Sequence, residues 1–343
     1  MDAMVRTLCD WIEIPSVTGD EKDYGDALAR RLDELGFDVL RQEVEPGRFN
    51  VLAKAGVPEV VMCTHLDTVP PFLPSRTTRE AVFGRGSCDA KGPAVAMLAA
   101  GERLLASGED RFGYLFTVGE EVDSAGAAHA DAKLDEMRPA GWTPRYVIVG
   151  EPTSGEFVRA GKGIFKAKLT ATGVAGHSSQ DVGPSAVHEL ASCIHRLLTG
   201  DWGEHPVLGP GTVNFGRIEG GVAANVVAAA AEASILVRTV EEPDVVRARI
   251  QDALGEHVVL TEDAKAYAPI DFLVPDEGGE GLAVAYGTDA PHMRSWGTPL
   301  LVGPGSILDA HTDHEKVGVQ ELDEAVARYE RTVRWLLEKL DAN

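Results

Sequence analysis

The sequence has little of what marks secreted, membrane-spanning or nucleic-acid-binding proteins. Its 343 residues contain only four cysteines, and these form no C-x-x-C pair, so neither a disulfide framework nor a zinc knuckle is indicated. No apolar run approaches the roughly 18 residues that a membrane span needs. Only 32 basic residues stand against 54 acidic ones, and the net charge of −22 disfavours nucleic acid and anionic membranes as partners.

The N-terminal segment carries acidic residues early and has no long apolar block ahead of a small-residue cleavage site. We therefore predict a helix of the mature fold rather than a signal peptide, and a cytoplasmic protein. The other acidic residues are spread along the chain, which is typical of a solubilising surface. With 44% hydrophobic and 25% charged residues, the chain has the composition of a globular protein that buries a large core.

The first half of the chain alternates helical patterns with short apolar strands. Residues 22–36 and 91–108 have helical periodicity, and each of these segments ends at a glycine. Short strands are predicted at the start of 59–69, at 112–118 and at 145–149. Strands rich in Val, Ile and Leu with helices between them predict an α/β fold, with a largely parallel sheet flanked by helices. Functional residues are then expected at the carboxyl ends of the strands.

From about residue 160 the pattern changes to the order strand, helix, strand, strand, helix, strand. The predicted elements are 164–173, 183–200, 212–221, 229–240, 242–256 and 257–263. This order suits a compact α+β domain of the ferredoxin-like type that is inserted into the first domain. We predict one domain from 1–159 and 267–343, closed by an amphipathic helix at 321–340, and an inserted domain from 160–266.

Acidic residues and histidines lie just beyond the apolar runs. The sequence has His65 and Asp67 in THLDTVP, Asp89 in GRGSCDAKG, Glu120 and Glu121 in TVGEEVDSAGA, Glu151 in VGEPT and His311 in GPGSILDAHTDHE. Imidazole nitrogens and carboxylate oxygens bind zinc-like ions, and one carboxylate can bridge two of them. Asp67, two residues after His65, is placed to hold the far ring nitrogen. Of two adjacent glutamates, one can bind metal while the other serves as general base.

Six ordered motifs connect these residues with a known family. THLDTVP, GRGSCDAKG, the GEE pair, GEPT, GHSS and GPGSILDAH resemble, in the same order, those of the co-catalytic zinc metallopeptidase and deacylase family. That family includes acetylornithine deacetylase, succinyl-diaminopimelate desuccinylase, aminoacylases and carboxypeptidase G. The resemblance covers essentially the whole chain. It implies a phosphorylase/hydrolase-like fold in which the inserted domain is a lid that also forms a homodimer.

The resemblance also implies a role for each candidate ligand. It assigns one divalent ion to His65, Asp89 and Glu151, and a second to His311, Asp89 and Glu121. Asp89 would therefore bridge the two ions, which are expected to be Zn²⁺, with Co²⁺ as the alternative. It also makes Glu120 the general base. Cys63 and Cys88 adjoin these motifs, and we expect them to be buried thiols rather than ligands.

Substrate contacts are implied by the same resemblance. His177, in AGHSSQ, would donate to the tetrahedral oxyanion from the partner subunit of the homodimer. Arg238 would grip a substrate carboxylate, and Asn225 would point toward the substrate. Gly303 and Gly305, in GPGS, would let the backbone approach the substrate.

Within the family, the stretch from Gly287 to His311 looks most like acetylornithine deacetylase. An acid at the position of Asp289 could meet a cationic substrate side chain. The predicted activity is therefore metal-dependent hydrolysis of the amide bond of a small N-acyl amino acid. Because this chain is shorter, with a clipped segment between His65 and Asp89, acetylcitrulline, acyl-lysine and succinyl-diaminopimelate stay open as substrates.

Two further readings of the same residues differ in function. A dipeptidase or carboxypeptidase could use the same metal site, and it would need an anchor for a free substrate amino terminus. A catalytically inactive relative that serves as a binding scaffold should have lost ligands or the base. The presence of all five ligands and Glu120 argues against the inactive reading.

Overall fold

The chain forms two compact units in a computed structural model that describes residues 3–342, apart from the side chains of 262–265. The first unit comprises the chain up to Arg159, Phe272–Leu282 and the chain from Thr288 onward. The second unit comprises Ala160–Asp271 and Ala283–Gly287. None of the helices in the described part of the chain is both long and apolar enough to cross a membrane.

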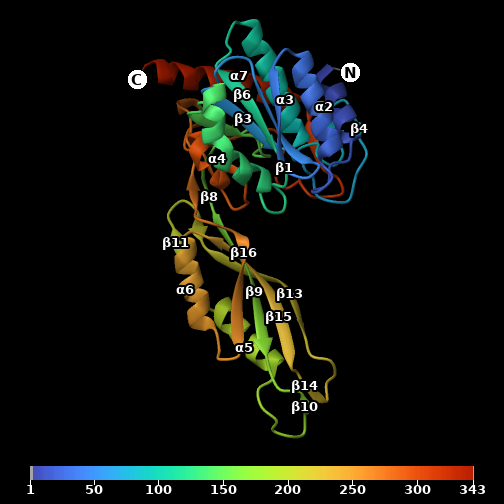
Figure 1. Ribbon diagram of the computed structural model, residues 1–343, viewed down its shortest axis with the longest axis vertical. Helices are drawn as coiled ribbons and strands as arrows, with labels where there is room; N and C mark the ends of the chain where they lie inside the picture. Colours follow the sequence, from blue (N-terminus) through green and yellow to red (C-terminus); the bar gives the residue numbers. More distant parts are fainter. Residues whose placement is uncertain (1–2, 343) are drawn as a thin grey trace. The chain divides into compact units, whose positions relative to one another are not determined.

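The first unit is built on a mixed sheet with a parallel centre (Figure 1). Its strands run in the order β1 (Asp38–Glu45), β2 (Arg48–Lys54), β6 (Phe112–Thr117), β3 (Val60–His65), β7 (Tyr146–Val149) and β19 (Thr298–Leu301). β3 is parallel to both β6 and β7, and β19 is parallel to β7. β1 and β2 form an antiparallel hairpin on one edge. The predicted α/β class, with a largely parallel sheet flanked by helices, is confirmed.

Helices cover this sheet because its central strands are apolar on both faces. The helices are α1 (Ala3–Ile12), α2 (Lys22–Glu34), α3 (Lys91–Ala106), α4 (Ala125–Met137) and α7 (Val319–Asp341). Val60 and Met62 of β3 join the main core together with α3 and α7, while Val61 and Cys63 are buried on the alternate face. A strand buried on both faces lacks the polar alternation of a half-exposed strand, as expected for the middle of a parallel sheet.

Short elements complete the first unit and the passages between units. β20 (Lys316–Gly318), β5 (Ala81–Phe83) and β4 (Arg76–Thr77) form a small sheet, and η1 (Arg138–Ala140), η2 (Asp276–Gly278), η3 (Ala290–His292) and η4 (Arg294–Trp296) are single 3₁₀ turns. β8 (Val158–Gly161), β17 (Ile270–Asp271) and β18 (Leu282–Val284) lie where the chain passes from one unit to the other. The β20–β5 pairing brings the segment after His311 beside the segment that precedes Asp89.

The second unit is an antiparallel sheet with two helices packed on it (Figure 1). Its sheet has the order β13 (Thr212–Gly220), β15 (Ala230–Thr239), β9 (Gly163–Thr172) and β16 (Val258–Tyr267), with α5 (Ala186–Leu198) and α6 (Pro243–Ala253). The chain order is therefore strand, helix, strand, strand, helix, strand. β10 (Gly176–His177) pairs with β14 (Val226–Val227), and β11 (Glu204–His205) pairs with β12 (Gly209–Pro210). Alternate residues of β9 and β15 face α5 and α6, which explains the alternating sequence pattern.

Candidate metal centre

The candidate ligands of the first unit gather where its parallel strands end. His65 is the last residue of β3, Glu120 and Glu121 follow β6, and Glu151 follows β7. Because β6, β3 and β7 are parallel neighbours, their carboxyl ends lie along one edge of the sheet. Side chains that leave these ends therefore meet above the same edge, as in other open α/β sheets.

Asp89 lies between two histidines and offers one carboxylate oxygen to each. Its Oδ1 is 2.9 Å from Nε2 of His65, and its Oδ2 is 3.3 Å from Nε2 of His311. Nε2 of His311 is also 3.0 Å from a carboxylate oxygen of Glu121. Donor atoms of His65, Asp89 and Glu121 all lie within 4.8 Å of one another. A carboxylate shared in this way between two nitrogen donors has the geometry of a bridging ligand.

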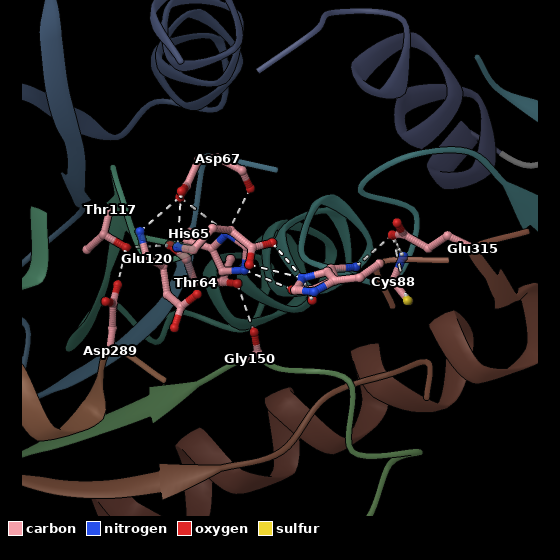
Figure 2. A network of polar contacts seen from close by, with 12 residues as sticks. Thr64, His65, Asp67, Cys88, Thr117, Glu120, Gly150, Asp289 and Glu315 are labelled. Atoms are coloured by element: carbon pink, nitrogen blue, oxygen red, sulfur yellow. Dashed lines mark hydrogen bonds and ion pairs between the residues drawn. The ribbon is translucent and has the colours of Figure 1, made fainter. Parts of the chain in front are cut away.

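Glu151 adds a buried carboxylate to the same group. It is 5% exposed, and the hydroxyl of Thr64 donates to the carbonyl oxygen of Gly150 at 2.8 Å, which ties the end of β7 to β3 (Figure 2). Burial raises the pKa of Glu151 well above its ordinary value, and the neighbouring charge of Asp89 adds to that rise. A buried carboxylate beside another negative group needs a cation close by to remain ionised.

The pKa values of the two histidines are set by their contacts with these carboxylates. Burial by itself would lower the pKa of His65, but its contacts with Asp67 and Asp89 outweigh burial and raise the pKa well above the usual value. Contacts with Asp89 and Glu121 raise the pKa of His311 to about 10. Burial would raise the pKa of Asp89, yet the two histidines hold it below its usual value. A divalent cation competes with protons for such oxygens and nitrogens, so these side chains fit a metal site.

The backbone of His311 is held in an uncommon conformation. Its φ of +63° lies in the left-handed region, which non-glycine residues adopt only at some energetic cost. Its side chain is 49% exposed, whereas the side chains of Asp89 and Glu121 are 6% exposed. The side chain of His311 is therefore much more exposed to solvent than those of Asp89 and Glu121, which it contacts. Strain at this residue indicates that its surroundings, rather than its own preference, decide where the imidazole points.

Asp67 contacts the far ring nitrogen of His65 chiefly through its backbone. Nδ1 of His65 lies 2.8 Å from the backbone carbonyl oxygen of Asp67 and 3.5 Å from its carboxylate. A carbonyl oxygen only accepts, so Nδ1 carries the proton and Nε2 faces Asp89. The carboxylate of Asp67 accepts instead from the backbone N–H groups of Glu120 and Glu121, both at 3.1 Å, and from the hydroxyl of Thr18 at 2.8 Å. Asp67 thus fixes His65 through its backbone and the glutamate pair through its side chain (Figure 2).

Asp289 faces the interior of the first unit. It is 2% exposed, and the hydroxyl of Thr117 donates to its Oδ2 at 2.5 Å (Figure 2). Burial raises the pKa of Asp289, and the contact with Thr117 partly opposes that rise. Its Oδ1 has no hydrogen-bond partner among the described residues, and a role for Asp289 in meeting a cationic substrate side chain stays a prediction.

Gly303 and Gly305 have packing reasons for lacking a side chain. A Cβ at Gly303 would lie 2.4 Å from the carbonyl oxygen of Glu151, and one at Gly305 would lie 2.4 Å from Cβ of Cys88. Both glycines therefore let the segment after β19 pack closely against ligand-bearing segments. A close approach of substrate to the backbone of Gly303 and Gly305 stays a prediction.

His177, Asn225 and Arg238 belong to the second unit. His177 lies in β10 opposite Val226, and its Nδ1 is 2.8 Å from the hydroxyl oxygen of Ser179. The N–H of Ser178 donates to the carbonyl oxygen of Asn225 at 3.1 Å, so the segments of His177 and Asn225 adjoin. Arg238 lies in β15, and its Nη1 is buried without a hydrogen-bond partner among the described residues. Their roles toward a substrate stay predictions.

Sequence reasoning missed two residues that hold the candidate ligands in place. One is Thr18, which donates to Asp67, and the other is Glu315, which accepts from the backbone of the Asp89 segment. Neither residue type is a distinctive signal, because threonines and glutamates are common on surfaces. The only hint was position, since Glu315 follows His311 by four residues in HTDHE.

Comparison with known proteins gives a consistent result. The model of the peptidase family M20/M25/M40 matches residues 61–335. A probable carboxypeptidase of Aspergillus terreus is 37% identical over 367 residues, which cover 94% of this chain and 84% of the relative. An M20 family metallo-carboxypeptidase of Sulfolobus solfataricus has a similar fold, with a TM-score of 0.78, 16% identity and coverage of 97% of this chain and 99% of that one.

A second solved structure carries a description of its metals. It is a dinuclear metal-binding peptidase of the M20 family from Bacillus subtilis, with a TM-score of 0.71, 14% identity and coverage of 97% of each chain. The family predicted from the motifs is confirmed, whereas the finer match to acetylornithine deacetylase stays a prediction. This chain belongs to the M20/M25/M40 peptidase family and is a hydrolase of amide or peptide bonds.

Proposed function

We propose that this protein hydrolyses the amide bond that precedes a carboxyl-terminal amino acid, in a small N-acyl amino acid or a dipeptide. The observation that carries the proposal is the position of Asp89, whose two oxygens face His65 and His311. We assign one divalent ion to His65, Asp89 and Glu151, and another to His311, Asp89 and Glu121. Zn²⁺ is the expected ion and Co²⁺ the alternative, since both accept nitrogen and carboxylate ligands. Such ions polarise a carbonyl and lower the pKa of a water molecule.

Glu120 is the general base in this proposal. It is 8% exposed, and its backbone N–H is fixed by Asp67 at 3.1 Å, while Glu121 beside it faces His311. Glu120 accepts a proton from the attacking water as the new carbon–oxygen bond forms. It then gives that proton to the amide nitrogen as the carbon–nitrogen bond breaks. The products are a carboxylic acid and an amino acid with a free amino group.

Residues of the second unit are assigned to the rest of the substrate. Arg238 is suited to a substrate carboxylate, because a buried guanidinium nitrogen without a partner lacks the hydrogen bond that such groups normally make. His177 is assigned to the tetrahedral oxyanion and Asn225 to the substrate beside it, since their segments adjoin. We further propose that His177 acts on the partner subunit of a homodimer that forms through this unit.

Two observations bear on the chemical class of the substrate. Asp289 accepts from Thr117 through Oδ2, while its buried Oδ1 has no partner among the described residues, so these contacts do not select a cationic substrate side chain over a neutral one. Acetylornithine therefore stands beside acetylcitrulline, acyl-lysine and succinyl-diaminopimelate as one candidate among N-acyl amino acids. The names of the fungal relatives, probable carboxypeptidases, favour the dipeptide alternative.

The first prediction concerns substrate and metal together. Protein supplied with Zn²⁺ or Co²⁺ should release amino acids from a panel of acetylated, succinylated and dipeptide substrates, and chelation should abolish the release. Amidation of the substrate carboxylate should raise KM strongly, because the partner of Arg238 is lost. Amino-acid release measured by chromatography checks both points. Full activity in metal-free protein, or equal activity on amidated substrates, would contradict the proposal.

The second prediction separates the two glutamates. Glu120→Gln should retain metal while kcat falls by at least about 100-fold, because only the base is lost. Glu121→Gln should weaken the binding of one ion, because its carboxylate faces His311. Metal content by mass spectrometry and kcat at saturating metal distinguish the variants. Exchanged phenotypes would show that the two roles are assigned the wrong way round.

The third prediction tests His177 across the proposed dimer. Mixing inactive His177→Ala with inactive Glu120→Gln should restore activity, because a heterodimer has one site in which both residues are intact. The activity should grow with the fraction of heterodimer, measured with two differently tagged subunits. Subunit exchange without any return of activity would mean that His177 acts within its own chain or not at all. An active enzyme that stays monomeric would also contradict the proposal.

A further inference from the structure

Glu315 is a buried acid that no step of the proposed reaction uses. It is 1% exposed and lies in the segment between His311 and β20. Its Oε1 accepts from the backbone N–H groups of Cys88 and Asp89, both at 3.2 Å. Its Oε2 accepts from Nη1 of Arg85 at 2.6 Å. Figure 2 shows its carboxylate turned toward the backbone of Cys88, at the opposite end of the network from Asp67 and Glu120.

The partner of Glu315 comes from the same segment as Asp89. Arg85 is 3% exposed, and its Nε also donates to the carbonyl oxygen of Pro71 at 3.3 Å. The backbone joins the two segments as well, because the N–H of Gly84 donates to the carbonyl oxygen of Glu315 at 3.1 Å. A buried ion pair gains little net stability, since desolvation offsets most of the attraction. Net stabilisation therefore does not explain why the Arg85–Glu315 pair is buried here.

The carboxylate of Asp67 makes a similar pair of backbone contacts in the same centre. Its carboxylate accepts from two successive backbone N–H groups, those of Glu120 and Glu121, just as Glu315 accepts from those of Cys88 and Asp89. Two adjacent N–H groups on one carboxylate fix both the position and the orientation of the peptide between them. Hydrogen bonds to an ionised acceptor are also stronger than neutral ones.

We propose that Glu315 is a positioning residue for Asp89, and that it determines where the Asp89 carboxylate stands between His65 and His311. Because Glu315 follows His311 by four residues, the same side chain couples the segment of one candidate ligand to the segment of another. The contact with Arg85 at 2.6 Å fixes the orientation of the Glu315 carboxylate. The inference rests on the proposed ligand assignment and extends it to a residue outside the ligand set.

Glu315→Gln tests this role with little change of shape. The amide keeps one acceptor oxygen, but its NH₂ group must face either Arg85 or the backbone N–H groups, and both are donors. Glu21→Gln is the matched control. Glu21 is also 1% exposed and is paired with an arginine, Arg48, at 2.6 Å, but its carboxylate accepts from no backbone N–H of a ligand segment in the described part of the chain.

The readout is the affinity of metal-free protein for Zn²⁺, measured by competition with a chromogenic chelator, together with the midpoint of thermal unfolding. Glu315→Gln should weaken Zn²⁺ binding by about 10- to 100-fold, as loss of an outer hydrogen bond to a ligand typically does. Glu21→Gln should leave Zn²⁺ affinity within about twofold even where its unfolding midpoint falls. At saturating metal, Glu315→Gln should lower kcat more than it changes KM, since the metal positions rather than the substrate contacts are altered.

Each outcome of this experiment decides a separate point. Equal Zn²⁺ affinity of Glu315→Gln and the wild type, with a lower unfolding midpoint, would overturn the inference and leave Glu315 a purely structural residue. Absence of Zn²⁺ binding by the wild type would instead overturn the proposed function. If Glu315→Gln does not fold, the same titration on Glu315→Asp decides, because the shorter side chain cannot reach Arg85 and both N–H groups together. A Zn²⁺ affinity of Glu315→Asp equal to that of the wild type would then contradict the inference.

Discussion

The centre of the first unit depends on one carboxylate, that of Asp89, standing between two imidazoles. Its contacts with His65 and His311 bring together residues that lie 246 positions apart in the sequence. Glu151 and Glu121 add further negative charge to the same place, and burial makes that charge costly. Protons on the histidines offset part of this cost. Divalent cations offset it more completely, which is why this group of side chains is suited to metal and poorly suited to a purely structural role.

Two acids outside the ligand set hold the segments that carry it. Asp67 accepts from the backbone of Glu120 and Glu121, and Glu315 accepts from the backbone of Cys88 and Asp89. Neither segment is a regular element at these residues, so its N–H groups would otherwise lack partners. Each carboxylate therefore satisfies buried backbone donors and fixes a functional side chain at the same time. The strained backbone of His311 belongs to the same arrangement, because its segment continues directly into Glu315.

Much of this arrangement could be predicted from residue patterns. The apolar segments 60–65 and 112–117 gave clear strands, because both faces of the sheet are covered and every residue of β3 and β6 is buried. The alternating pattern of 164–173 predicted the first strand of the second unit, because the helices cover only one face of that sheet. Motifs placed after strands located His65, Glu121 and Glu151, since the carboxyl ends of parallel strands converge.

Other features left no such pattern. β1 has no buried residue, so its sequence, DVLRQEVE, shows no apolar face, and the hairpin that it forms with β2 was not predicted. α4 buries mainly alanine and glycine, and its weak amphipathic pattern likewise gave no prediction. The spacing placed Asp67 near the far ring nitrogen of His65, but it could not show that the backbone carbonyl lies closer to that nitrogen than the carboxylate does. Glu315 was not predicted, because its contact with Arg85 joins residues 230 positions apart in the sequence.

The central claim is that this group of side chains holds two divalent ions with Asp89 between them. Crystals of the protein grown with Zn²⁺, measured with X-rays on both sides of the zinc absorption edge, test it most directly. The account predicts two anomalous peaks per chain, one beside Nε2 of His65 and one beside Nε2 of His311, with a carboxylate oxygen of Asp89 next to each. Ions bound away from these residues, or a protein that binds none under those conditions, would contradict it.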